Sequence, residues 1–118
     1  MAERPRLICA SPALAESGRA VRFEVEYFGA PAPAFVVRFE GRVYGYLNRC
    51  GHQPMELDWR EGEVFDAEGR NLICSTHGAV YAPDSGRCLG GPCGGTPLLR
   101  LQVEERDGRV YYLGVQDG

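Results

Sequence analysis

The feature that most constrains the fold of this chain is a pair of short segments that each place a histidine close behind a cysteine. The first segment contains Cys50-Gly51-His52, and the second contains Cys74-Ser75-Thr76-His77. The chain has only 2 histidines, and both lie in these segments. Thiolate sulfur and imidazole nitrogen are good ligands for borderline and soft transition metals. We therefore expect a fold that brings two loops together around one metal centre.

Two kinds of metal centre fit these residue types. A tetrahedral zinc ion accepts two sulfur and two nitrogen ligands, but zinc sites usually pair Cys with Cys and His with His. Here each segment is mixed: C-x-H, then 21 residues, then C-x-x-H. In a binuclear cluster with two cysteines on one iron and two histidines on the other, each loop gives one ligand to each iron. The mixed pairs favour this cluster over zinc, and over histidines that are only packed in a core.

The pattern of apolar residues predicts an all-β protein. Val21, Phe23, Val25 and Tyr27 alternate with charged residues, which is typical of a half-buried strand. Further strands are expected at residues 35–39, 43–47, 64–65, 71–74, 99–103 and 110–113, with hairpin turns at Glu40-Gly41-Arg42 and Asp107-Gly108. The segment 29–33, rich in Gly and Pro, is expected to break the strand at 19–28, and residues 54–60 are expected to form at most a short helical turn.

Length and composition are those of one ordinary globular domain. The chain has 118 residues, 44% hydrophobic and 25% charged residues, and a formal net charge of −3. This charge argues against binding to nucleic acid or to an anionic membrane, and no apolar run reaches the roughly 20 residues that span a bilayer. Residues 7–15 faintly resemble a signal peptide, but a strand followed by a turn is favoured because Ser11 and Pro12 interrupt the run. A cytoplasmic location is therefore expected.

The middle of the chain differs from its ends. Residues 46–94 hold four of the five cysteines and both histidines, whereas residues 1–45 and 95–118 have the pattern of strands that build a core. We expect a single domain, 1–118, in which a cluster-binding subdomain (46–94) is inserted between strands of a base domain (1–45 and 95–118).

Together these motifs resemble the Rieske iron–sulfur family. Its pattern is C-x-H, a spacer of about fifteen to twenty-odd residues, and C-x-x-H, and the match continues through the segment 81–86 and Gly91-Pro92. The resemblance implies a fold of antiparallel sheets and one 2Fe-2S cluster. It implies that Cys50 and Cys74 bind the inner iron as thiolates, and that His52 and His77 bind the outer iron through imidazole nitrogen. Neutral imidazole ligands raise the potential into a window of roughly −150 to +300 mV.

The resemblance also indicates which residues surround the cluster. Gly51 and Gly78 are expected to let backbone N–H groups approach sulfur, and Pro92 to lie in a loop over the cluster. Tyr81 matches a family tyrosine, whereas Ala79 stands where some relatives carry a serine that donates to a bridging sulfide. The cysteines that form a disulfide in respiratory Rieske proteins have no counterpart, since those positions hold Met55 and Ser75 or Thr76. We therefore expect a potential in the lower or middle part of the window.

The resemblance favours a Rieske-type ferredoxin, an electron-transfer protein and not itself an enzyme. It would carry single electrons between a reductase and an acceptor such as a ring-hydroxylating oxygenase. Both histidines are already used, so none is left for the mononuclear iron of a terminal oxygenase. The alternative is a non-catalytic Rieske subunit, or a redox-sensing module, of a larger complex.

Three other features have more than one interpretation. The acidic spacer 56–68 is either a solvated loop or a docking face for a basic partner. Cys88 and Cys93 are expected to be reduced, inert thiols, with a loop disulfide or redox-active thiols as alternatives. Trp59 and Met55 are expected to pack beside the cluster, and Cys9 to be a small buried residue.

Overall fold

A computed structural model describes residues 6–27, 29–48, 62–74, 78–91 and 97–115. The elements in chain order are β1 (Arg6–Ala10), a 3₁₀ turn η1 (Ser11–Ala13), β2 (Val21–Tyr27), β3 (Ala30–Phe39), β4 (Arg42–Leu47), β5 (Leu72–Ile73), β6 (Val80–Tyr81), β7 (Cys88–Gly90), β8 (Arg100–Arg106) and β9 (Arg109–Val115). The all-β prediction is confirmed, and the segment at 7–15 begins as a strand, as expected. No helix in these ranges is long and apolar enough to cross a membrane.

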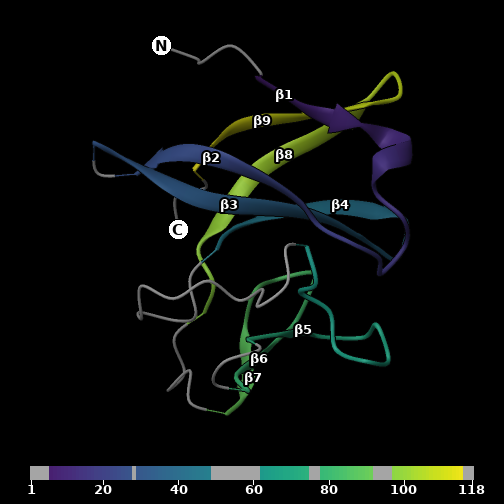
Figure 1. Cartoon of the computed structure of the whole chain (residues 1–118), viewed down its shortest axis with the longest axis vertical. Coiled ribbons are helices and arrows are strands. Elements are labelled where there is room, and N and C mark those ends of the chain that lie inside the picture. Colours follow the sequence, from purple (N-terminus) through teal and green to yellow (C-terminus); the bar gives the residue numbers. More distant parts are fainter. Residues whose placement is uncertain (1–5, 28, 49–61, 75–77, 92–96, 116–118) are drawn as a thin grey trace.

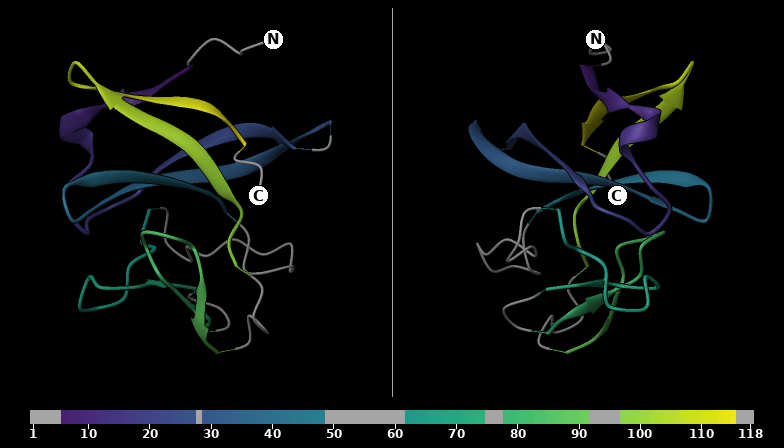
Figure 2. Two further views of the ribbon diagram at one scale, coloured as in Figure 1. Left: turned by 180° about the vertical axis from the view of Figure 1, so that it is seen from behind. Right: turned by 45° about the vertical axis from the view of Figure 1, so that its right-hand side comes forward.

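The strands form two antiparallel sheets at opposite ends of the molecule (Figures 1 and 2). The larger sheet has the order β1-β9-β8-β4-β3-β2, and the smaller has the order β5-β6-β7. The smaller sheet comes entirely from residues 72–90, inside the segment expected to bind the cluster. The larger sheet comes from both ends of the chain. The boundaries expected for the cluster-binding subdomain, residues 46 and 94, stay a prediction. β4, a strand of the larger sheet, runs to Leu47 and so extends past the first of these boundaries.

The strand expected at 19–28 does end, at Tyr27, but the predicted extent of the break, 29–33, is wrong, because β3 begins at Ala30 and includes Pro31 and Pro33. Pro33 pairs with Glu24 of β2. Its carbonyl oxygen accepts a hydrogen bond from the backbone N–H of Asn48 at 2.8 Å, on the side of β3 that faces away from β2. The backbone groups of one residue in a strand point to the same side. The missing N–H of Pro33 therefore faces away from β2, and the β2–β3 ladder is not interrupted.

The predicted hairpins are confirmed, and each has a turn with two consecutive residues at positive φ. Glu40 and Gly41 have φ of 50° and 78°, and Asp107 and Gly108 have φ of 52° and 76°. Such turns match the right-handed twist of the strands that they join. In the first hairpin, the carboxylate of Glu16 accepts hydrogen bonds from the backbone N–H groups of Glu40 (2.5 Å) and Gly41 (2.8 Å).

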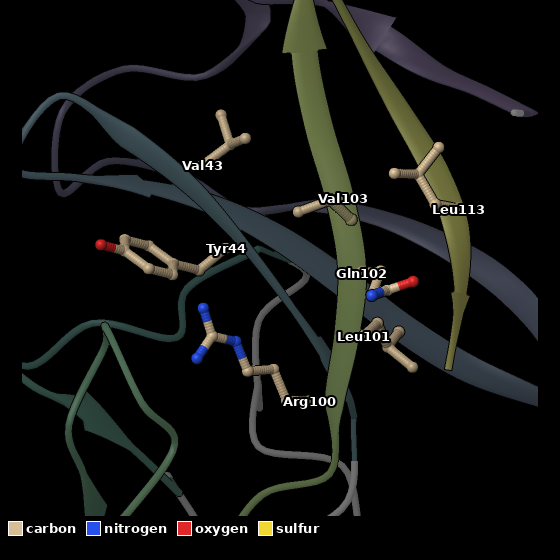
Figure 3. Close-up of a pocket in the computed structure, with 7 residues that line it drawn as sticks. All are labelled: Val43, Tyr44, Arg100, Leu101, Gln102, Val103 and Leu113. Carbon is tan, nitrogen blue, oxygen red and sulfur yellow. The ribbon is translucent and has the colours of Figure 1, made fainter. Parts of the chain in front are cut away.

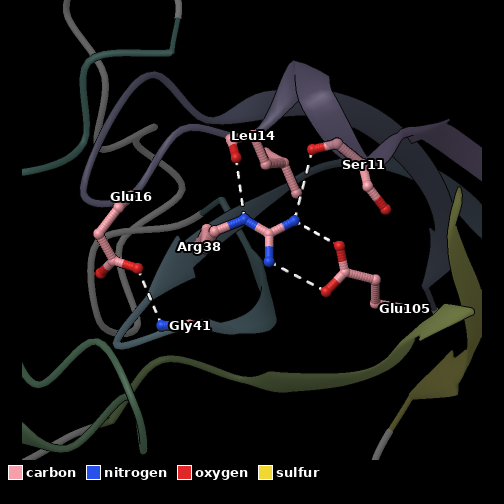
Figure 4. A network of polar contacts seen from close by, with 6 residues as sticks. All are labelled: Ser11, Leu14, Glu16, Arg38, Gly41 and Glu105. Carbon is pink, nitrogen blue, oxygen red and sulfur yellow. Dashed lines mark hydrogen bonds and ion pairs between the residues drawn. The ribbon is translucent and has the colours of Figure 1, made fainter. Parts of the chain in front are cut away.

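Arg38 ties the N-terminal segment to the larger sheet (Figure 4). Its Nε donates to the carbonyl of Leu14 at 2.9 Å, and its two Nη atoms contact the carboxylate of Glu105 at 2.9 and 2.5 Å. This forked contact lowers the pKa of Glu105 to about 2, because the guanidinium stabilises the ionised carboxylate. Arg38 therefore links β3, β8 and the chain that follows β1.

One buried cluster joins the two sheets. Phe35, Val37 and Tyr46 enter it from the larger sheet, and Leu72, Cys74, Ala79 and Tyr81 enter it from the smaller sheet and its loops. The hydroxyl of Tyr46 also donates to the carbonyl of Pro83 at 2.7 Å, in the turn between β6 and β7. The smaller sheet is therefore packed on the larger one through a shared core cluster.

Candidate metal centre

Cys74 is the one predicted iron ligand that lies within the described residues. It follows β5 directly, keeps its thiol, and is fully buried in the core cluster that contains Leu72, Ala79 and Tyr81. Its backbone N–H donates to the carbonyl of Ala79 at 2.9 Å. Cys74 is therefore held at the start of a loop by the strand before it and by the residue that leads into the next strand. A buried thiol held in this way fits the role of a thiolate ligand to an inner, protected iron.

The segment that begins at Cys74 closes on itself at Gly78. The N–H of Gly78 donates to the carbonyl of Cys74 at 2.7 Å, and Gly78 has a φ of 75°, which favours glycine. The expectation that Gly78 lets backbone N–H groups approach sulfur stays a prediction. In the structure, Gly78 is held to Cys74 by this hydrogen bond.

The two neighbouring residues predicted to lie near the cluster are also buried beside Cys74. Ala79 and Tyr81 have no exposed surface, and both belong to the same core cluster as Cys74. Ala79 has no side-chain donor, as the sequence indicated. The structure therefore brings Cys74, Ala79 and Tyr81 together, as expected of residues on one side of a single site.

Gly91, which directly follows β7, lies against the backbone of Gly78 and Ala79. Gly91 has a φ of 81°, and a Cβ atom added to it would lie 2.8 Å from the carbonyl oxygen of Gly78 and 2.9 Å from the Cα of Ala79. Only a glycine lets the two backbones approach so closely. The sequence pointed to Gly91 only as part of a Gly-Pro pair. The contact with Gly78 and Ala79 depends on tertiary structure, and no local pattern signals it.

The other predicted ligands lie outside the described residues. These are Cys50, His52 and His77, together with Gly51, Pro92, Cys93, Met55 and Trp59 and the suggested helical turn at 54–60. Within the part of the chain that is described, no group of three or more Cys, His, Asp or Glu side chains is arranged to hold a metal ion. The full ligand set thus stays a prediction from the sequence.

Cys88 differs from expectation. It is bonded in a disulfide, whereas a reduced thiol was expected, and its partner is not among the described residues. Cys88 is half-buried on β7 opposite Tyr81 of β6, at the edge of the core cluster that contains Cys74. Cys9 keeps its thiol on β1 but is only half-buried, not buried as expected, and the pKa of this thiol is raised because partial burial disfavours the charged form.

A separate hollow of about 240 Å³ lies on the larger sheet and has no metal-binding character (Figure 3). It is lined by Val43, Tyr44, Arg100, Leu101, Gln102, Val103 and Leu113. Arg100 and Tyr44 lie side by side, with the guanidinium carbon 5.8 Å from the ring centroid. The lining contains no thiol, imidazole or carboxylate, so this hollow is not part of the metal centre.

The fold is shared with known iron–sulfur proteins of similar size. The structure resembles the ferredoxin of carbazole 1,9a-dioxygenase from Nocardioides aromaticivorans IC177, with 21% identity, a TM-score of 0.71, and coverage of 95% of this chain and 99% of that chain. It resembles Sphingomonas yanoikuyae B1 ferredoxin with 20% identity, a TM-score of 0.69, and coverage of 97% and 100%. A chain in the complex of reduced oxygenase and oxidized ferredoxin in carbazole 1,9a-dioxygenase gives 25% identity, a TM-score of 0.71, and coverage of 94% of both chains.

The sequence itself identifies the family. No curated protein matches the chain significantly. The model of the Rieske [2Fe-2S] domain, however, matches residues 6–104, a range that includes both Cys–His segments and every strand from β1 to β7. Because this match covers most of the chain and the fold agrees with it, the chain belongs to the Rieske [2Fe-2S] domain family.

Proposed function

We propose that this protein is a Rieske-type ferredoxin that carries single electrons between a reductase and an oxygenase. The observation that carries the proposal is the match to the Rieske domain over residues 6–104, combined with a buried Cys74 thiol at the start of the second Cys–His segment. The two ferredoxins of similar fold align over 99% and 100% of their own lengths.

The residues proposed to hold the 2Fe-2S cluster are those of the two mixed segments. Cys50 and Cys74 would bind one iron, and His52 and His77 the other. The cluster supplies a site that accepts and releases one electron. The chain supplies part of the surroundings: Cys74 and Ala79 are buried, and Gly91 lies close against the backbone of Gly78 and Ala79. The lack of a side-chain donor at Ala79 favours a potential in the lower or middle part of the Rieske window.

A carrier is favoured over a catalytic oxygenase by the supply of ligands. Both histidines of the chain belong to the cluster segments, and the described residues hold no second group of side chains suited to a metal. A terminal oxygenase of carbazole 1,9a-dioxygenase from Nocardioides aromaticivorans IC177 also shares this fold, but this chain covers only 31% of it. We therefore assign electron transfer, and no catalytic step, to these 118 residues.

The distribution of charge indicates the kind of partner. Residues 46–94 contain seven acids and four arginines, whereas the rest of the chain contains nine of each. The net charge of −3 therefore belongs to the cluster-binding segment. Complementary charge mainly increases the rate of encounter, so a partner with a basic docking face is expected to associate faster at low salt. The complex named above joins a ferredoxin to an oxygenase, and we propose an oxygenase as the acceptor here.

The test begins with the purified protein. Electron paramagnetic resonance is recorded before and after dithionite reduction, alongside iron, sulfide and zinc analysis. A rhombic signal that appears on reduction, with two irons per chain, is expected. A colourless protein with one zinc per chain would show that the mixed segments hold a structural ion, and the carrier assignment would be abandoned.

A second test concerns the partner and the location. Electron transfer to a candidate oxygenase is followed by rapid mixing at increasing salt, and a rate that falls with salt supports docking through the acidic segment. A rate independent of salt favours the interpretation of residues 56–68 as a solvated loop. The cytoplasmic location is part of the same proposal, and cell fractionation would check it.

A further inference from the structure

We propose that the hollow on the larger sheet, where β4 and β8 separate, is a binding site for a small aromatic carboxylate (Figure 3). Its lining comes only from β4, β8 and β9, and it includes no residue of the two Cys–His segments. The proposal therefore does not depend on the cluster or on the proposed function. It assigns to this chain a second site, which would recognise a small organic anion.

The hollow exists because the ladder between β4 and β8 ends while both strands continue. The last pair of this ladder toward the hollow is Gly45 with Leu101. β4 begins at Arg42 and β8 ends at Arg106, and both strands lie wholly within the described residues. Beyond the last pair the two strands move apart, as Figure 3 shows, and the hollow lies between them.

A bulge in the neighbouring strand pair shapes the other side of the hollow. Gln102 of β8 pairs with Gly114 of β9, and the next residue, Val103, pairs with Tyr112. Leu113 is therefore an extra residue in β9, and its side chain lines the hollow. Bulges redirect side chains and are frequent next to functional sites. Both irregularities of the sheet, the end of the ladder and the bulge, thus border the same hollow.

Most of the lining is apolar. Val43, Val103 and Leu113 are half-buried, so each of them packs into the protein and still presents apolar surface outward. A ring placed against these side chains would be removed from water together with them, which favours binding. The volume of about 240 Å³ is below the roughly 300 Å³ at which pockets for drug-sized ligands begin, so we expect a ligand with a single ring.

Arg100 carries the only formal charge in the lining. Its guanidinium carbon lies 5.8 Å from the centroid of the Tyr44 ring, and this contact holds the guanidinium at the hollow. A guanidinium that lies on a ring keeps N–H groups at its edge, and these can bind a carboxylate through two parallel hydrogen bonds. Among the described residues, Arg100 has no ion-pair partner, so a bound carboxylate would not have to displace one.

One guanidinium beside an apolar wall selects a singly charged ion with an apolar body. A phosphate monoester carries about −1.5 to −2 charges at pH 7 and three strong acceptor oxygens, more than a single arginine can pair. A carboxylate needs only the two donors that one guanidinium presents. The amide of Gln102 also lines the hollow and can donate a further hydrogen bond.

The experiment titrates the purified protein, in its oxidised state, with benzoate as the probe and follows the methyl signals of the protein by NMR. We expect saturable shifts at Val43, Val103 and Leu113, with a Kd on the order of 1 mM, because the ligand has few atoms. Benzamide has the same ring without the charge, and acetate has the charge without the ring. Each is expected to bind about tenfold more weakly than benzoate. The absence of saturable shifts at these methyl groups overturns the proposal, and so does equal binding of benzoate and benzamide.

Two arginines of β8 give a matched pair of variants. Arg106 also lies against a ring, with its guanidinium carbon 5.4 Å from the centroid of the Tyr111 ring, but it does not line the hollow. We expect Arg100→Gln to weaken benzoate binding about tenfold and Arg106→Gln to leave it unchanged. Equal weakening by both variants would show a general attraction of anions to basic side chains and overturn the site. If Arg100→Gln does not fold, the comparison of benzoate with benzamide on the wild-type protein decides.

A further ligand separates a free anion from the end of a protein chain. N-Acetylphenylalanine places its carboxylate beside an amide, as a C-terminal residue does. Binding of N-acetylphenylalanine tenfold tighter than benzoate would indicate a site for a protein C-terminus and overturn the assignment to a small anion. Binding no tighter than that of benzoate supports the assignment. A protein that lacks iron and sulfide would refute the electron carrier, whereas the titration of the hollow is decided separately.

Discussion

Replacement of Gly91 by alanine tests whether the close contact between β7 and the Cys74 loop supports the metal centre. Gly91 follows β7 at a φ of 81°, and its added Cβ would meet the Gly78 oxygen at 2.8 Å and the Ala79 Cα at 2.9 Å. Both atoms belong to the backbone, so neither can turn away as a flexible side chain would. The two backbones must therefore separate, and we expect Gly91→Ala to loosen the packing beside buried Cys74.

Two free-energy costs determine the expected effect of Gly91→Ala on stability. An L-residue in the left-handed region costs roughly 1–2 kcal/mol relative to a relaxed conformation. Forcing an additional methyl group into a close-packed contact typically costs about 1–3 kcal/mol more. Even the lower sum, about 2 kcal/mol, makes the open state of this segment roughly 30-fold more populated.

The adjacent residue provides a matched control. A Cβ added to Gly90 meets nothing within 4 Å, so Gly90→Ala is expected to change stability by no more than about 0.5 kcal/mol. The assay compares the two variants by iron and sulfide content, by the rate of cluster loss to a chelator, and by urea unfolding. If Gly91→Ala keeps its cluster and its unfolding midpoint as well as Gly90→Ala does, the contact does not support the centre and the reasoning is refuted.

Three further predictions concern the potential, acid stability and the core. Ala79→Ser adds a donor beside buried Cys74 and is expected to raise the reduction potential, because a hydrogen bond to the cluster stabilises the added electron; a redox titration without an upward shift would contradict this. The pKa of Glu105 is lowered to about 2 by Arg38, so its contribution to stability is present above about pH 4.3 and is lost as the pH falls toward 2. Because the Arg38–Glu105 pair is partly exposed, we expect Glu105→Gln to remove roughly 1 kcal/mol of this acid-dependent stability. The difference between the urea unfolding midpoints at pH 5 and pH 3 should then be smaller in the variant than in the wild type. Tyr46→Phe leaves the buried carbonyl of Pro83 without its donor and is expected to cost about 1–3 kcal/mol in urea unfolding, whereas an unchanged midpoint would show that another group replaces the hydroxyl.

Much of the fold could be predicted from local patterns. Alternating apolar residues identified β2 and β8, and apolar runs beside the Glu40-Gly41 and Asp107-Gly108 turns identified the hairpins. Local sequence is sufficient there because the period of two and the turn residues act within a few residues. The segment 29–33 misled the same reasoning. Whether a proline interrupts a sheet depends on which side of the strand is paired, and that is decided by strands distant in sequence.

The candidate site, like the fold, could be predicted from the sequence only in part. The spacing of Cys50, His52, Cys74 and His77 alone indicated a binuclear cluster, because metal ligation requires particular residue types at particular intervals. The sequence did not indicate that the Gly78 N–H would bind the carbonyl of Cys74, or that Gly91 would lie against Ala79. Both contacts depend on the path of the backbone in three dimensions.

The sequence by itself therefore predicted the chemistry of this protein, and it identified the family and most of the strands. Tertiary structure alone decided that Tyr46 of the larger sheet holds the turn at Pro83, that one core joins both sheets, and that Cys88 is bonded as a disulfide. The physical reason is distance along the chain. Ligand type and strand period are properties of neighbouring residues, whereas packing, hydrogen-bond partners and disulfides are set by residues that only the completed fold brings together.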